Sequence, residues 1–168
     1  SKIFNKNNIL RFVFKSFSMI YLSLIVFGLL YIISSKPELK IFFVYSILVS
    51  IASDVGGLVF GKLFKGRKLT KISPKKTIWG SVGSFIFSFL LIPFFLDLIF
   101  NHEIISLFII TILISLTTQL GDLFISFIKR KAKVKNTSDL LPGHGGVLDR
   151  IDGIIFAIPI GYLLLNYF

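Results

Sequence analysis

The stretch IISLFIITILISLTTQLGDLFISFI, residues 104–128, decides the fold class of this chain. A helix that crosses a bilayer needs about 20 consecutive, mostly apolar residues, and this stretch is longer than that. Its only charged residue is Asp122, which lies near its C-terminal end, and the basic run KRK follows it directly. The stretch therefore predicts a membrane-spanning helix.

Four further apolar blocks cover about residues 17–33, 41–60, 78–100 and 153–168. Because backbone polar groups in lipid must be satisfied internally, long uninterrupted apolar runs favour helices over barrel strands. The chain is 54% hydrophobic with only 16% charged residues, whereas soluble domains carry about 25% charged residues. We therefore expect one all-α domain over residues 1–168, a polytopic integral membrane helical bundle of about five transmembrane helices with two basic cytoplasmic loops.

The charged residues predict how the bundle is oriented. Nearly all of the 19 Lys and Arg residues lie in the N-terminal segment, in the loop after the second block and in the loop after the fourth. Five spans put these three regions on one side, and the positive-inside rule makes that side cytoplasmic. A net charge of +11 would suggest nucleic acid for a soluble protein, but here it indicates orientation and contact with anionic membrane lipids. We expect no nucleic-acid partner.

Four carboxylates approach the cytoplasmic ends of the predicted helices: Asp54, Asp122, Asp149 and Asp152. Acids inside a membrane segment are functional candidates by default. Asp149 and Asp152 are three residues apart, which places them on one helical face at the start of the last block. Hard cations such as Mg²⁺ take carboxylate ligands and bridge them to phosphates. The alternative is structural: Asp54 and Asp122 pair with nearby Lys or Arg, and Asp152 complements a helix dipole.

The two basic loops contain segments suited to phosphate binding. In KLFKGRKLTKISPKKT, residues 62–77, Pro74 interrupts any helix and Thr77 is predicted to cap the next one. A helix N-terminus with a hydroxyl and neighbouring lysines is a good phosphate-binding site. The alternative is that these lysines only set the membrane topology or contact anionic lipid headgroups. In LPGHGG, residues 141–146, glycines allow backbone N–H groups to approach a phosphate. His144 either binds phosphate, shuttles a proton or orients a neighbouring group, or it is a solvated loop residue.

The segment SFIKRKAKVKNTSDLLPGHGGVLDRID, residues 126–152, resembles the C-terminal signature of the phosphatidate cytidylyltransferase (CDP-diacylglycerol synthase) family. KISPKKT, residues 71–77, Gly121-Asp122, and Asp54 with Gly57 are similar to further motifs of that family, in the same order. Two positions depart from the pattern: Asn136 replaces an Asp, and Trp79 replaces an acid. Family members are usually longer at the N-terminus, and this chain does not begin with Met. We therefore expect a short or truncated member.

The resemblance implies a Mg²⁺-dependent nucleotidyltransferase of phospholipid biosynthesis. CTP and phosphatidic acid would give CDP-diacylglycerol and pyrophosphate at the cytoplasmic face of a bacterial inner membrane, in a homodimer that uses Mg²⁺ and a possible second cation. The implied catalytic residues are Asp122, Asp149, Lys129, Arg130 and His144. The implied substrate-binding residues are Asp54, Lys71, Ser73, Lys75, Lys76, Thr77, Lys135, Gly145, Gly146 and Arg150. The implied metal ligands are Asp122, Asp149, Asp152 and Asp54.

Three other readings stay open at this point. One is a CTP-dependent kinase or transferase that acts on another lipid, such as an isoprenoid alcohol. The second is a catalytically weakened relative that binds lipid or nucleotide, which the departures at Trp79 and Asn136 allow. The third is a transporter, since acids and glycine-broken helices occur there too, although transporter sites lie near the midplane rather than toward one face.

Overall fold

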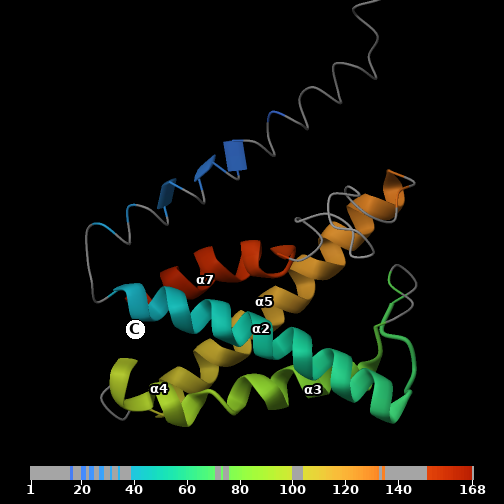
Figure 1. The fold of residues 1–168 in the computed structure, drawn as a ribbon, viewed down its shortest axis with the longest axis horizontal. Helices are drawn as coiled ribbons and strands as arrows, with labels where there is room; N and C mark the ends of the chain where they lie inside the picture. Colours follow the sequence, from blue (N-terminus) through green and yellow to red (C-terminus); the bar gives the residue numbers. More distant parts are fainter. Residues whose placement is uncertain are drawn as a thin grey trace, which may run out of the picture. The chain divides into compact units, whose positions relative to one another are not determined.

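A computed structural model shows the fold (Figure 1). It describes residues 39–70, 73, 76–99, 104–132, 134 and 151–167, together with isolated residues between 16 and 34. The chain divides into two compact units, Ser1–Lys40 and Ile41–Phe168. In the first unit the described residues between 16 and 34 are helical. The second unit contains nearly all of the described helices and the candidate site.

The described helices confirm the all-α prediction. They are α2 (Leu39–Phe64), α3 (Ile78–Phe89), α4 (Ile92–Ile99), α5 (Ile104–Lys131) and α7 (Ile154–Tyr167). No strand of a sheet occurs among the described residues; the only β-type pairing there is a single bridge between Lys68 and Thr77. Helix α5 lies at the centre of the second unit and contacts α3, α4 and α7.

The prediction of one continuous helix over residues 78–100 was wrong. The structure has two helices there, α3 and α4, bent by 46° at the break after Phe89. Pro93 explains the break, because proline has no N–H to donate and its ring clashes with the carbonyl four residues earlier, here that of Phe89. Pro93 is the second residue of α4, in the first turn, where a proline is tolerated.

Two described helices are long and apolar enough to cross a membrane, α2 over Lys40–Phe64 and all of α5. The bent pair α3–α4 adds a third span if it is counted as one. Helix α7 has 14 residues, a length of about 21 Å, which is short of the hydrocarbon thickness of about 30 Å. The protein is therefore an all-α membrane protein, and the number of five spans stays a prediction.

Helices α2 and α3 approach each other through glycines. A β-carbon at Gly56 would lie 2.3 Å from the carbonyl oxygen of Gly83. A β-carbon at Gly83 would lie 2.6 Å from the Gly56 carbonyl oxygen and 2.4 Å from the β-carbon of Phe60. Small residues at such positions let membrane helices come into backbone contact, where dispersion and weak polar interactions replace the hydrophobic effect.

Hydroxyl groups join α2 to α5 and α3 in the buried centre. Ser50 and Thr118 share a hydrogen bond of 2.7 Å, and Ser53 bonds to Ser115 at 3.0 Å. From α3, Ser84 donates to the Ser53 carbonyl oxygen at 2.7 Å. Hydrogen bonds of this kind between membrane helices contribute about 0.6 kcal/mol each on average. They fix the rotation of α2 and so the direction in which Asp54, the residue after Ser53, points.

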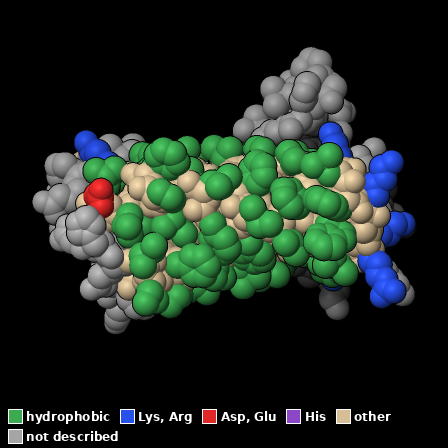
Figure 2. Space-filling view, turned by 90° about the horizontal axis from the view of Figure 1, so that it is seen from below, with side chains coloured by type: hydrophobic (Ala, Val, Ile, Leu, Met, Phe, Trp, Pro, Cys, Tyr) green, Lys and Arg blue, Asp and Glu red, His purple; other side chains and the backbone are tan. Residues whose placement is uncertain are grey.

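The surface agrees with a lipid environment. Figure 2 shows hydrophobic side chains covering the middle of one face, while Lys and Arg side chains lie toward the ends and gather most densely at one of them. Many large apolar side chains are exposed, among them Leu63 of α2 at 69% and Phe94 of α4 at 74%. Contiguous exposed apolar surface of this extent marks contact with lipid or with other helices.

The glycine contact gives a first prediction. Gly83→Ala should lower the free energy of unfolding by about 1–3 kcal/mol, because the added methyl collides with backbone as well as with Phe60. Thermal unfolding of the purified protein in detergent measures this. Val82→Ala, at an exposed neighbouring position of α3, is the matched control and should change stability little. An unaltered unfolding temperature in Gly83→Ala would contradict the close approach of the two helices.

Candidate active site

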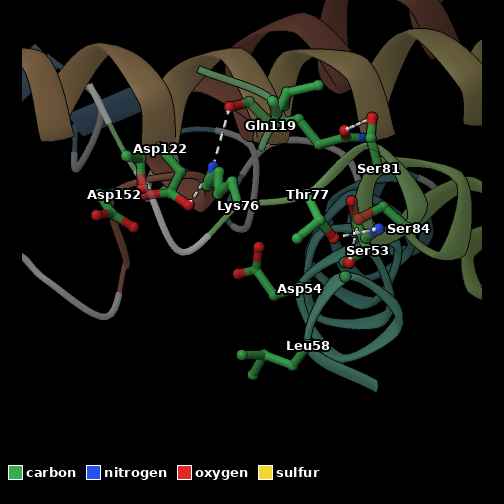
Figure 3. A pocket seen from close by; sticks show the side chains of 14 residues that line it. Ser53, Asp54, Leu58, Lys76, Thr77, Ser81, Ser84, Gln119, Asp122 and Asp152 are labelled. Atoms are coloured by element: carbon green, nitrogen blue, oxygen red, sulfur yellow. Dashed lines mark hydrogen bonds and ion pairs between the residues drawn. The ribbon is translucent and has the colours of Figure 1, made fainter. Parts of the chain in front are cut away.

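A cavity of about 360 Å³ opens at the end of the bundle where the α2–α3 loop meets the C-terminal half of α5. Side chains from α2, α3, α5 and the segment before α7 converge on it (Figure 3). Its lining is mainly hydroxyl, carboxylate and glycine, with two leucines. The lining residues are Ser53, Asp54, Gly57, Leu58, Leu69, Ser73, Lys76, Thr77, Gly80, Ser81, Ser84, Gln119, Asp122 and Asp152.

The end of the α2–α3 loop is tied down by backbone contacts. Leu69 donates to the carbonyl oxygen of Lys76 at 2.8 Å, and Lys76 donates to that of Ser73 at 3.0 Å. Thr77 caps α3 as predicted, since its hydroxyl oxygen accepts a hydrogen bond from the Gly80 N–H at 3.0 Å. These contacts hold the backbone of Lys76 at the rim of the cavity, two residues before the first residue of α3.

Lys76 connects the loop to α5. Its ammonium forms an ion pair with the carboxylate of Asp122, and it also donates to the main-chain carbonyl oxygen of Gln119 at 3.4 Å. The side chains of the pair are 25% and 26% exposed. The pair predicted as the structural alternative for Asp122 is therefore present in this structure, and it lies on the cavity rather than in the bundle core.

Asp152 forms the second ion pair. The Lys129 ammonium lies 3.4 Å from its carboxylate, and both side chains are nearly buried, at 13% and 10% exposure. Burial, together with the negative charge of Asp122, raises the pKa of the Asp152 carboxyl to about 6, against the opposing effect of Lys129. Asp152 lies in the turn that precedes α7, not within the first turn of the helix as predicted.

Asp54 completes a group of three acids at the cavity. It projects from α2 into the opening (Figure 3), near enough to Asp122 and Asp152 for their charges to interact. The structure thus brings together three of the four predicted carboxylates. Within the described residues, however, no three acidic or histidine side chains are close enough to form a ready metal site.

Several predicted site residues cannot be compared with the structure. These lie outside the described residues: Lys71, Lys75, Lys135, His144, Gly145, Gly146, Asp149 and Arg150. Of the described ones, Ser73 and Thr77 line the cavity. Arg130 does not; it is exposed at the end of α5 and donates to the Val134 carbonyl oxygen at 3.5 Å.

Trp79, one of the two departures from the family pattern, does not face the cavity. Its ring packs on Phe64 with 5.4 Å between ring centroids and covers Gly66, where a β-carbon would lie 2.3 Å from the indole. The indole is 48% exposed, as is typical of tryptophans that anchor a helix at the membrane interface. The substitution therefore changes the outer surface of the loop and leaves the cavity lining intact.

Sequence reasoning gave no role to Gln119, Ser81 or Ser84, all of which line the cavity. The Ser81 hydroxyl donates to the Gln119 side-chain oxygen, and the Gln119 amide donates to Ser115 at 3.4 Å. Gln119 therefore joins α3 to α5 at the floor of the site. Its position three residues before Asp122, on the same face of one helix, is the sequence signal that would have indicated this role.

Fold and cavity together define a helical membrane protein with a cavity lined by acids and a lysine at one end of the helix bundle. Residues 2–168 match the cytidylyltransferase family, and the chain belongs to that family. It is 37% identical to phosphatidate cytidylyltransferases of Staphylococcus haemolyticus and Staphylococcus saprophyticus and 34% identical to that of Staphylococcus aureus strain COL. Each match covers 97% of this chain but 63% of the relative's length.

The raised pKa of Asp152 gives a second prediction. Because the folded state holds this proton more tightly than the unfolded chain does, the folded state loses stability as pH rises from about 4 to about 6. The loss amounts to at most about 3 kcal/mol. Denaturant unfolding in detergent with a metal chelator measures it. Asp152→Asn should remove this part of the pH dependence; identical pH profiles for the two proteins would contradict the assignment.

Proposed function

We propose that this protein transfers the cytidylyl group of CTP to phosphatidic acid, giving CDP-diacylglycerol and pyrophosphate. The observation that carries the proposal is the convergence of Asp54, Asp122, Asp152 and Lys76 on one cavity at a membrane end. The family of the chain, and relatives named for this activity, support it. No observation favours the kinase, weakened-relative or transporter alternatives.

In the proposed reaction, a phosphate oxygen of phosphatidic acid attacks the α-phosphorus of CTP. The new P–O bond forms as the bond from the α-phosphorus to the bridging oxygen breaks, and pyrophosphate leaves with that electron pair. The substrate supplies the nucleophile, so the protein's task is to bring two anions together and to stabilise the charge of the transition state. The N-terminus of α3, capped by Thr77 and preceded by Lys76, is suited to hold a phosphate.

We further propose that Mg²⁺ binds at Asp122 and Asp152, with Asp149 and Asp54 as further acids. The donor chemistry of the cavity fits a hard cation, because its charged ligands are carboxylate oxygens. When bound, the cation would neutralise phosphate oxygens and assist the departure of pyrophosphate. Lys129 would keep Asp152 ionised and oriented, and Gln119 would hold α3 and α5 at the spacing that the acids require.

The lipid would reach the site from the side. Leu58 of α2 lines the cavity and is 63% exposed, and Leu69 of the loop lines it as well. An acyl chain lying along this apolar rim would leave its phosphate beside Asp54 and Lys76. The cytoplasmic location of this face, in a bacterial inner membrane, rests on the charge distribution of the loops. The homodimer and the second cation that the resemblance implies stay predictions.

The activity itself is the third prediction. Purified protein with CTP, phosphatidic acid and Mg²⁺ should form CDP-diacylglycerol and pyrophosphate in equal amounts, and Asp122→Asn should lower kcat by about 10²-fold or more. Asp97→Asn, an exposed acid of α4 outside the cavity lining, is the control and should retain wild-type turnover. Release of CDP from CTP and an isoprenoid alcohol, with no reaction on phosphatidic acid, would instead establish the lipid-kinase alternative.

The lateral approach of the lipid gives a fourth prediction. Leu58→Asn should raise KM for phosphatidic acid several-fold and leave KM for CTP unchanged, because it places an amide where the acyl chain enters. Leu63→Asn is the matched control, since Leu63 is equally exposed on α2 but does not line the cavity. Equal changes in KM for phosphatidic acid in the two variants, or a change in KM for CTP, would exclude entry of the lipid past Leu58. Initial rates in mixed micelles supply both constants.

A further inference from the structure

The charge balance of the cavity poses a problem for binding phosphates. Among the described lining residues there are three carboxylates, Asp54, Asp122 and Asp152, and a single cation, Lys76. That cation is already paired with Asp122. Among these described residues, an incoming phosphate therefore meets more negative than positive charge, and the lysine there is engaged by an acid.

Lys76 is built to exchange partners with its side chain alone. Its backbone is fixed by the hydrogen bonds to Ser73 and Leu69 and by the bridge between Lys68 and the adjacent Thr77. Its ammonium, in contrast, contacts among the described residues the Asp122 carboxylate and, through one long hydrogen bond, the Gln119 carbonyl oxygen, and the side chain is one quarter exposed. Because the backbone is fixed and the lysine side chain is flexible, the ammonium can turn from α5 toward the cavity without any movement of the loop.

We propose that Lys76 is an exchangeable counter-ion of Asp122. A divalent cation that binds Asp122 displaces the ammonium, and the displaced ammonium turns into the cavity and binds a substrate phosphate. One event thus offsets the excess negative charge of the described lining: the bound cation adds two positive charges, and the ammonium of Lys76 is freed from Asp122 to meet the phosphate. This inference rests on the proposed function, and it makes phosphate binding depend on the cation binding first or together with the phosphate.

The second ion pair is not built for the same exchange. Lys129 and Asp152 are about half as exposed as Lys76 and Asp122, and Lys129 does not line the cavity. Its displacement would deliver no charge to a phosphate there. The structure therefore assigns exchange to Lys76 and a fixed supporting role to Lys129, which gives an internal comparison within one chain.

The fifth prediction follows from this difference and uses Mn²⁺ alone as the probe. An amine-acylating reagent is applied to the purified protein in detergent, with and without saturating Mn²⁺, and labelling is read by mass spectrometry. Labelling of Lys76 should increase several-fold with Mn²⁺, while Lys129 stays protected and the exposed Lys68 labels equally in both conditions. In Asp122→Asn, Lys76 should label rapidly whether or not Mn²⁺ is present.

Mn²⁺ affinity, measured by electron paramagnetic resonance of the free ion without nucleotide, provides the second readout. Lys76→Met should bind Mn²⁺ about two- to fivefold more tightly than the wild type, the range expected from losing a partly exposed competing ion pair. Lys76→Arg keeps the competitor and should bind Mn²⁺ like the wild type. Lys68→Met removes a charge from the same loop without touching Asp122, and should also leave the affinity unchanged.

The outcomes separate this inference from the proposed function. Suppose that Mn²⁺ binds, that labelling of Lys76 is the same with and without it, and that Lys76→Met binds Mn²⁺ like the wild type. The counter-ion exchange is then wrong, and turnover of CTP by the same preparation still supports the proposed function. If Lys129 is released together with Lys76, the cation loosens the whole site and the assigned exchange is also wrong. If the wild type neither binds Mn²⁺ nor turns over CTP with phosphatidic acid, both proposals fail.

Discussion

The close contact between α2 and α3 is the constraint on which the site depends. Gly56 and Gly83 bring the two backbones together, and further along the interface a β-carbon at Gly61 would lie 3.3 Å from the Thr77 hydroxyl. The contact therefore continues to the first residue before α3, where the cap forms. Because the helices are held at this distance, the end of the loop that joins them places Lys76 opposite α5. A bulkier residue at the glycines would separate Asp54 from the lysine across the cavity.

The same interface shows how a membrane protein combines stability with a polar site. In lipid, apolar burial does not drive one helix against another, so contacts between small residues and hydroxyl hydrogen bonds have to hold the bundle. Along α2 the hydroxyls of Ser50 and Ser53 turn inward to α5, and the next residue, Asp54, turns to the cavity. The polar groups that hold the bundle together thus lie next to the polar groups that line the cavity. Gln119 does both, because it bonds to Ser81 of α3 and lines the cavity.

Much of this arrangement could be predicted from the sequence, for physical reasons that differ by element. Helices α2 and α5 follow from apolar length alone, and the Thr77 cap follows from a hydroxyl placed before an apolar run. The break at Pro93 was missed because hydropathy does not register a missing N–H donor; the proline itself was the available signal. Convergence of Asp54, Asp122 and Asp152 needed the three-dimensional structure, since spacing along the chain fixes a helical face but not what that face meets. The roles proposed for His144 and Asp149 remain sequence predictions.

The effect of Trp79 depends on where its side chain lies and not only on its residue type; Asn136, the other departure from the family pattern, lies outside the described residues. An acid replaced by tryptophan suggests a damaged site when only the sequence is read. In the structure Trp79 points to Phe64 and Gly66, on the surface of the loop, while the neighbouring Gly80 faces the cavity. An exposed acid there would contribute a negative charge close to Lys76, whereas the indole contributes none and packs on the end of α2. Lys76, Thr77 and Trp79 belong to the same short segment. Packing of Trp79 on Phe64 therefore also helps to hold the backbone of Lys76 in place. The substitution is therefore compatible with a working site, and its effect is expected on loop position rather than on chemistry.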